Sequence, residues 1–203
     1  MTKPISAFSW AFSARKLFVA LALLPLAIGL FAPMEARAES VAAYVQRVQN
    51  ELIAAQRSNS KTAYASVLRQ HMDVPYVSLT ALGGDYARAL PKAERPNFYN
   101  GVIRFIADYG TKDGPKYPVA SAVVTGIGEE TKGGAEVDTR ITLRSGETYD
   151  VRWSLVRSGA TFKVRDASVG IFSARSQLER LFQNWLDENG KNPRSLVVVL
   201  NKF

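Results

Sequence analysis

The spacing of apolar residues changes twice along this chain, and these changes constrain the fold more than any other feature. Up to Tyr109 the apolar residues recur three or four positions apart, the spacing of one buried helix face. From Tyr117 to Val164 they alternate with polar residues, as in strands with one buried face. After Ser173 the helical spacing returns. Helices, then a sheet, then helices again predict an α+β fold.

Capping and breaking residues divide the helical parts into segments. We predict helices over 40–57 and 61–71, a third that opens at Asp73-Val74-Pro75 and stops at Gly83-Gly84, and a fourth from Pro91 or Pro96 to Tyr109. In the last part, one amphipathic helix buries a wide stripe and is stopped by Gly190. Asn192-Pro193 then begins a short final helix. The stripe consists of Leu178, Leu181, Phe182, Trp185 and Leu186.

Three turn signals interrupt the alternating region: Lys132-Gly133-Gly134, Ser145-Gly146 and Ser158-Gly159. They separate four segments, each with one apolar and one polar face, and the short turns predict antiparallel neighbours. We therefore predict a four-stranded antiparallel sheet whose apolar face is covered by helices.

The first 38 residues have the layout of a secretory signal peptide. Basic residues precede an apolar run from Leu17 to Phe31, and Ala36-Arg37-Ala38 is a small-x-small site, so we expect cleavage after Ala38. An uncleaved membrane anchor is the alternative, but the run has fifteen residues, short of the roughly 20 that cross a bilayer. We expect residues 39–203 to form a single domain in the periplasm.

Charge and composition exclude several classes of function. The chain has no Cys, so an exported form cannot be a disulfide scaffold, use a thiol nucleophile or bind metal through thiolates. Its net charge is +8, and residues 150–203 carry nine Lys and Arg against five acids. This positive charge could bind anionic headgroups or an acidic protein partner, or it could belong to a solvent-exposed surface with no partner. Export and the lack of a basic block argue against nucleic acid as a partner.

Two residues are candidates for catalysis. His71 is the only histidine, and no Gly-x-Ser-x-Gly motif accompanies it, so a surface or helix-end position is the better interpretation. Asp166 could act as a general base inside a closed fold, but capping the loop or helix near residues 170–173 is favoured. We predict no catalytic, cofactor or metal-binding residue.

The last third of the chain carries an ordered set of motifs. Lys163-Val164-Arg165-Asp166 is followed by Gly170, Ser173, a helix with Gln and Phe, Gly190 and a terminal Leu/Val run. Earlier, Leu82-Gly83-Gly84-Asp85-Tyr86 precedes a long helix. In this order and spacing the chain resembles the MlaC family, also known as toluene-tolerance or ABC-transporter auxiliary proteins.

The resemblance implies a sheet wrapped by helices, similar to the NTF2-like cone, around an apolar cavity that holds phospholipid as cargo, without a cofactor. It implies a non-enzymatic periplasmic carrier that maintains the lipid asymmetry of the outer membrane. We expect the protein to be a monomer. Its expected partners are an outer-membrane lipoprotein complex and an inner-membrane ABC transporter with an MCE-domain subunit.

Strand alternation and helical phase predict which side chains would line such a cavity. Two other interpretations stay open: an NTF2-like enzyme that uses an acid such as Asp166 on a small apolar substrate, and a docking module with a filled core and a basic face. The expected lipid-binding residues are Val102, Phe105, Ile106, Val123, Ile141, Val151, Trp153, Phe162, Leu178 and Phe182.

Overall fold

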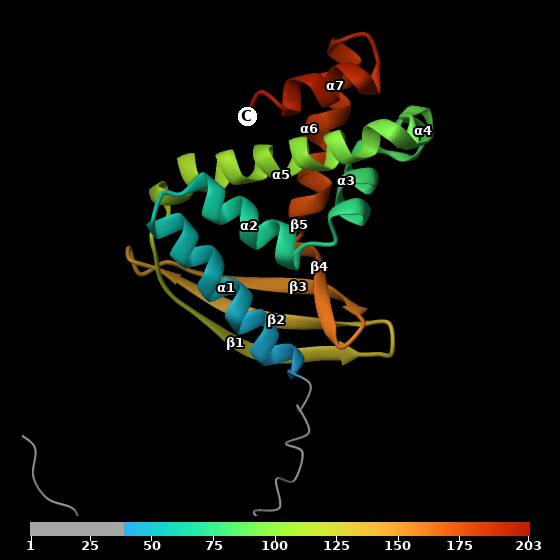
Figure 1. Ribbon diagram of the computed structural model, residues 1–203. Helices are drawn as coiled ribbons and strands as arrows, with labels where there is room; N and C mark the ends of the chain where they lie inside the picture. Colours follow the sequence, from blue (N-terminus) through green and yellow to red (C-terminus); the bar gives the residue numbers. More distant parts are fainter. Residues whose placement is uncertain (1–38) are drawn as a thin grey trace, which may run out of the picture. The chain divides into compact units, whose positions relative to one another are not determined.

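The computed structural model describes residues 39–203, which form seven helices, two 3-10 turns and one sheet (Figure 1). The predicted signal peptide and its cleavage site lie outside the described residues. The helices are α1 (Val41–Arg57), α2 (Lys61–His71), α3 (Val74–Leu82), α4 (Gly84–Ala89), α5 (Arg95–Lys112), α6 (Ala174–Glu188) and α7 (Pro193–Leu200), with 3-10 turns at Lys92–Glu94 and Gly114–Lys116. The strands are β1 (Val119–Glu130), β2 (Gly134–Leu143), β3 (Thr148–Ser158), β4 (Thr161–Val169) and β5 (Phe172–Ser173).

The strands pair in sequence order, and every pair is antiparallel. The predicted α+β class is confirmed, but the sheet has five strands instead of four. Strand β5 was not predicted because it has two residues, too few to show alternation, and it pairs only with the end of β4.

Polar side chains start most of the helices where the sequence predicts. Ser40 Oγ accepts a hydrogen bond from Ala43 N at the start of α1, and Ser60 does the same for α2. These caps satisfy backbone amides that have no partner inside the helix. Helix α4 was not predicted, because it begins within the Gly83-Gly84 pair, which by itself indicates the end of a helix. It has six residues and no side-chain cap.

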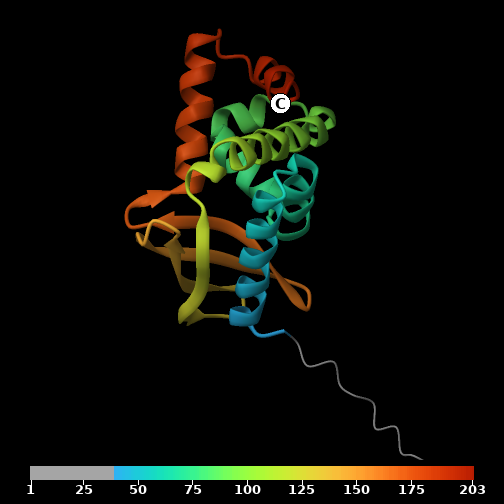
Figure 2. The same cartoon turned by 90° about the vertical axis from the view of Figure 1, so that its left-hand side faces the viewer.

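The helices lie on one side of the sheet, and Figure 2 shows α1 lying along the sheet and α6 rising from β5. The opposite sheet face is wet and carries ion pairs, including Arg140 to Asp150 and Arg152 to Asp138, at 2.8 Å each. The hydrogen bond from Arg152 holds the pKa of Asp138 below its usual range. One apolar and one charged face match the expected two-layer arrangement.

Buried side chains form three separate clusters instead of one continuous core. The first lies between α1 and strands β2–β4 and includes Tyr44, Trp153 and Phe162. The second joins α3, α5, α6 and α7 and is centred on Phe98 and Phe182. The third lies between α2 and α5 and consists of Ala65, Ile103 and Ala107. Large apolar side chains of all three clusters meet around a common space.

A short link attaches the helical layer to the sheet. Asp73 N, between α2 and α3, donates to Val164 O at 2.8 Å, and Met72 forms a parallel bridge with Val164. This link fixes the end of α2 over β4. Among residues 39–203, no helix is long and apolar enough to cross a membrane.

Candidate functional site

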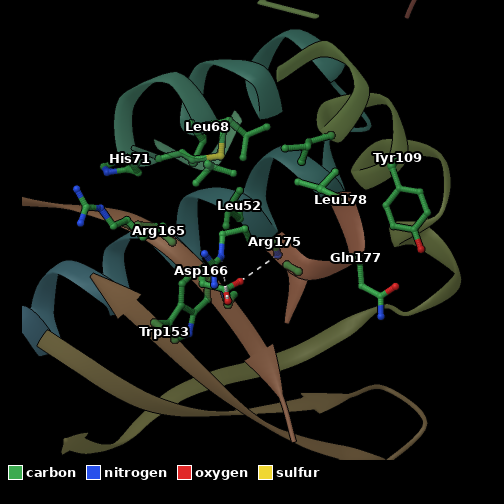
Figure 3. A pocket seen from close by; sticks show the side chains of 18 of the residues that line it. Leu52, Leu68, His71, Tyr109, Trp153, Arg165, Asp166, Arg175, Gln177 and Leu178 are labelled. Atoms are coloured by element: carbon green, nitrogen blue, oxygen red, sulfur yellow. Dashed lines mark hydrogen bonds and ion pairs between the residues drawn. The ribbon is translucent and has the colours of Figure 1, made fainter. Parts of the chain in front are cut away.

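A cavity of about 690 Å³ lies where the three buried clusters meet (Figure 3). Its wall comes from α1, α2, α3, α5 and α6 together with strands β3 and β4. Pockets that bind organic ligands have volumes of roughly 300–1,000 Å³. The described part of the chain therefore encloses a hollow interior of ligand size.

The wall is predominantly apolar. Tyr109 and Leu181 line the cavity although they are 64% and 53% exposed, so the space reaches solvent beside them. Neither side chain would be so exposed in a closed core. The apolar and aromatic lining residues are Val48, Leu52, Tyr64, Val67, Leu68, Met72, Val77, Phe105, Ile106, Tyr109, Trp153, Val164, Ala167, Ala174, Leu178 and Leu181.

Trp153 and Tyr64 show how aromatic rings are held in this wall. Trp153 Nε1 donates to Thr139 Oγ1 at 3.0 Å, so the only polar atom of the indole is satisfied within the sheet. Tyr64 fits against α5 because a Cβ at Gly110 would lie 2.5 Å from its Cζ. Burial raises the pKa of the Tyr64 phenol. Both rings thus form part of the wall without needing a charged neighbour.

His71 ends α2 and is 4% exposed, so the helix-end position is as expected but a surface position is not. Its Nε2 lies 2.8 Å from Glu51 Oε2, and its Nδ1 lies 3.2 Å from the Tyr44 hydroxyl. Burial raises the pKa of Tyr44 to about 12. Both ring nitrogens of His71 therefore have structural partners, and no serine hydroxyl is hydrogen-bonded to either among the described residues.

Asp166 caps the connection between β4 and α6. Its Oδ1 accepts from Ala167 N at 2.9 Å and from Arg175 N at 3.1 Å, and its Oδ2 accepts from Ser173 Oγ at 2.6 Å. Figure 3 marks the contact between Asp166 and Arg175. Both carboxylate oxygens are engaged in holding the start of α6, which is the capping role that the sequence favours.

Four of the ten residues predicted to bind lipid line this cavity: Phe105 and Ile106 of α5, Trp153 of β3 and Leu178 of α6. Val102 and Phe182 are buried in the second cluster, and Phe162 is buried in the first. Ile141 and Val151 line a smaller pocket of about 390 Å³. The structure therefore brings four of the predicted residues together at this cavity and places the others in the buried clusters, the smaller pocket or, for Val123, the surface.

Val123 is the predicted lining residue that the structure places farthest from expectation, since it is 50% exposed. Strand β1 contains register shifts between Val119 and Ser121 and between Val124 and Gly126. Each irregularity changes which residues face the helices, so simple alternation fails along β1. Ala122 is buried in its place.

Helix α2 and the polar residues of the wall were not predicted to line the cavity. Tyr64 and Leu68 are four residues apart on α2, a spacing that could have identified this helix as part of the wall. The polar lining residues are His71, Arg165, Asp166, Arg175 and Gln177. No spacing rule brings the end of α2, strand β4 and the first turn of α6 together, so these five residues could be grouped only from the structure. Residues 39–203 contain no cluster of three potential metal ligands.

Comparison with known proteins agrees with this architecture. The family model of the MlaC protein matches residues 38–201. Among solved structures, a phospholipid-binding protein from Ralstonia solanacearum, in complex with a phospholipid, is similar with a TM-score of 0.63 and 12% identity. The match covers 79% of this chain and 94% of that protein. At this identity the likeness shows a shared fold. No curated protein matches the chain.

Proposed function

The chain belongs to the MlaC family, and on this premise we propose that it is a phospholipid-binding carrier in the periplasm, not an enzyme. The observation that carries the proposal is the apolar cavity of about 690 Å³ between the helices and the sheet. A solved structure of the same fold was obtained in complex with a phospholipid. The acyl chains of the cargo would lie against Phe105, Trp153 and Leu178.

The physical chemistry of lipids explains why such a carrier is useful. A lipid with two chains has on the order of 30 methylene groups, and at about 0.8 kcal/mol each their exposure to water would cost roughly 20 kcal/mol or more. Transit between membranes therefore requires an apolar container. The cavity supplies one with no reaction step.

In this proposal the protein moves phospholipid between an outer-membrane lipoprotein complex and an inner-membrane ABC transporter with an MCE-domain subunit. That traffic would maintain lipid asymmetry in the outer membrane. The predicted signal peptide would deliver the chain to the periplasm as a monomer.

The direct test is mass spectrometry of the organic extract from protein exported to a bacterial periplasm and purified without detergent. We expect phospholipid at a fixed ratio to protein. An extract with no lipid, or with only a small non-lipid molecule, would contradict the proposal.

Two variants locate the lipid. Phe105→Asp and Leu178→Asp each place a carboxylate in the apolar wall, where it is poorly solvated, so we expect both to lose lipid. Val198→Asp is the matched control, because Val198 lies on α7 and is 61% exposed. Circular dichroism checks that all three keep their helices. Lipid retention in both cavity variants would mean that these residues do not line the binding site.

A further inference from the structure

Two of the five polar residues in the cavity wall are arginines, Arg165 on β4 and Arg175 in the first turn of α6 (Figure 3). Both guanidinium groups lie near the same ring: their Cζ atoms are 4.1 Å and 5.9 Å from the ring centroid of Tyr76. Tyr76 is 37% exposed. The two arginines thus lie beside Tyr76 at a polar part of the cavity wall that solvent can reach.

Arg165 is held in place by one hydrogen bond, and its other donors have no acceptor among residues 39–203. Its Nε donates to Asp73 Oδ2 at 2.9 Å, which fixes the plane of the guanidinium. Within residues 39–203, its two terminal nitrogens have no hydrogen-bond acceptor. An oriented guanidinium with free terminal nitrogens presents two parallel donors to an incoming group.

Arg175 is less satisfied still. Its Nε is buried and has no hydrogen-bond partner among the described residues, and Asp166 Oδ2 is 3.9 Å away. Its Nη1 makes one long contact of 3.5 Å, to the Tyr76 hydroxyl. Asp166 cannot move closer without giving up its bonds to Ser173 and to the backbone of α6. The protein encloses Nε, so the donors that Arg175 can offer to a ligand are those of Nη1 and Nη2, whose only hydrogen-bond partner among residues 39–203 is the Tyr76 hydroxyl.

The chemistry of that ligand follows from the donors and from the space beside them. A guanidinium group suits the oxygens of a phosphate, which accept bidentate hydrogen bonds. The apolar wall continues from the arginines to Leu178 and Phe105, so the same molecule should carry apolar chains. We propose that Arg165 and Arg175 bind the phosphate of the carried lipid. This assignment rests on the proposed function and adds the position of the headgroup.

Each of the two arginines lies near a carboxylate. Asp73 and Asp166 offset the two positive charges, so recognition should depend on the guanidinium geometry more than on net charge. Lysine keeps the charge but has no planar pair of donors. We therefore expect Arg175→Lys to behave like Arg175→Gln, and not like the wild type.

The experiment compares uptake of a phospholipid and of the diacylglycerol with the same chains by delipidated protein, scored by mass spectrometry. We expect the wild type to prefer the phospholipid by about tenfold or more, because only that lipid offers a charged acceptor. Arg165→Gln, Arg175→Gln and Arg175→Lys should take up both lipids equally while binding diacylglycerol as well as the wild type does. Arg180→Gln, an exposed arginine on α6 outside the cavity, should keep the preference.

The outcomes separate this proposal from the proposed function. A wild type that takes up both lipids equally, or arginine variants that keep the preference, would overturn the headgroup site and leave the carrier intact. A wild type that takes up neither lipid would overturn the carrier itself. Inorganic phosphate is titrated in a parallel arm: if it binds through Arg175 as tightly as the phospholipid, the site serves free phosphate, and the lipid assignment is wrong. If loss of the Asp73 contact unfolds Arg165→Gln, the two Arg175 variants decide.

Discussion

Replacement of Asp166 by alanine tests whether this carboxylate is a structural cap. The substitution removes the acceptor for Ala167 N, Arg175 N and Ser173 Oγ, at 2.9, 3.1 and 2.6 Å. A hydrogen bond to a charged group contributes about 1.5–3 kcal/mol, but bonds that share one acceptor are not additive. The side chain of Asp166 is 14% exposed, so water can reach the freed donors only in part. We expect the free energy of unfolding to fall by about 2–4 kcal/mol.

The assay is urea denaturation followed by circular dichroism, with Asp187→Ala as the matched control. Asp187 is also an acid of α6, but its side chain is 60% exposed and its nearest cation, Lys191 Nζ, is 3.6 Å away. Its loss should cost less than about 0.5 kcal/mol, as for other exposed pairs on helices. If the two alanine variants are equally stable, the hydrogen bonds of Asp166 do not hold α6, and the reasoning fails.

Three further predictions concern single positions. Gly190→Ala should lower the free energy of unfolding by about 1–2 kcal/mol in urea denaturation, because the residue ends α6 at φ 78°; an unchanged midpoint would contradict this strain. Hydrogen bonds from Lys112 and Lys61 hold the pKa of Asp108 below its usual range, so its stabilisation is full above about pH 4 and is lost as the pH falls through the lowered pKa. Asp108→Asn should thus be less stable than the wild type at pH 7 and equally stable in acid; a gap independent of pH would be evidence against the ion pairs. Thr139→Val should cost about 1–3 kcal/mol, because a buried indole N–H loses its acceptor; a neutral result would show that the bond is dispensable.

Local chemistry made much of the fold predictable. Ser40, Ser60, Asp73 and Asn192 cap helices through their own side chains, which depends only on the next three residues. Hairpin turns are equally local, and the turn at Gly146 has the positive φ that its glycine indicates. Such signals do not need the rest of the molecule, so the sequence alone carries them.

The cavity lining was only partly predictable because several helices are buried on more than one side. Phe105 and Val102 lie on α5 one turn apart and both pack in the second cluster, yet only Phe105 also lines the cavity. Phe182 and Leu178 divide in the same way on α6. Helical phase identifies a buried residue but not which of two neighbours it meets. Whether an interior is filled or hollow depends on the distances between whole helices and the sheet, and the periodicity of the sequence does not give these distances.

The hydrogen bond between Trp153 and Thr139 has a practical consequence for spectroscopy. After Trp10 only two tryptophans follow, Trp153 and Trp185. Trp153 forms part of the cavity wall with its N–H fixed, whereas Trp185 packs against the second cluster. The wavelength of indole emission shifts with the polarity of its surroundings. A ligand in the cavity should therefore shift the emission maximum of Trp153 and leave that of Trp185 unchanged. A Trp185→Phe variant would be a label-free fluorescent sensor of its own cargo.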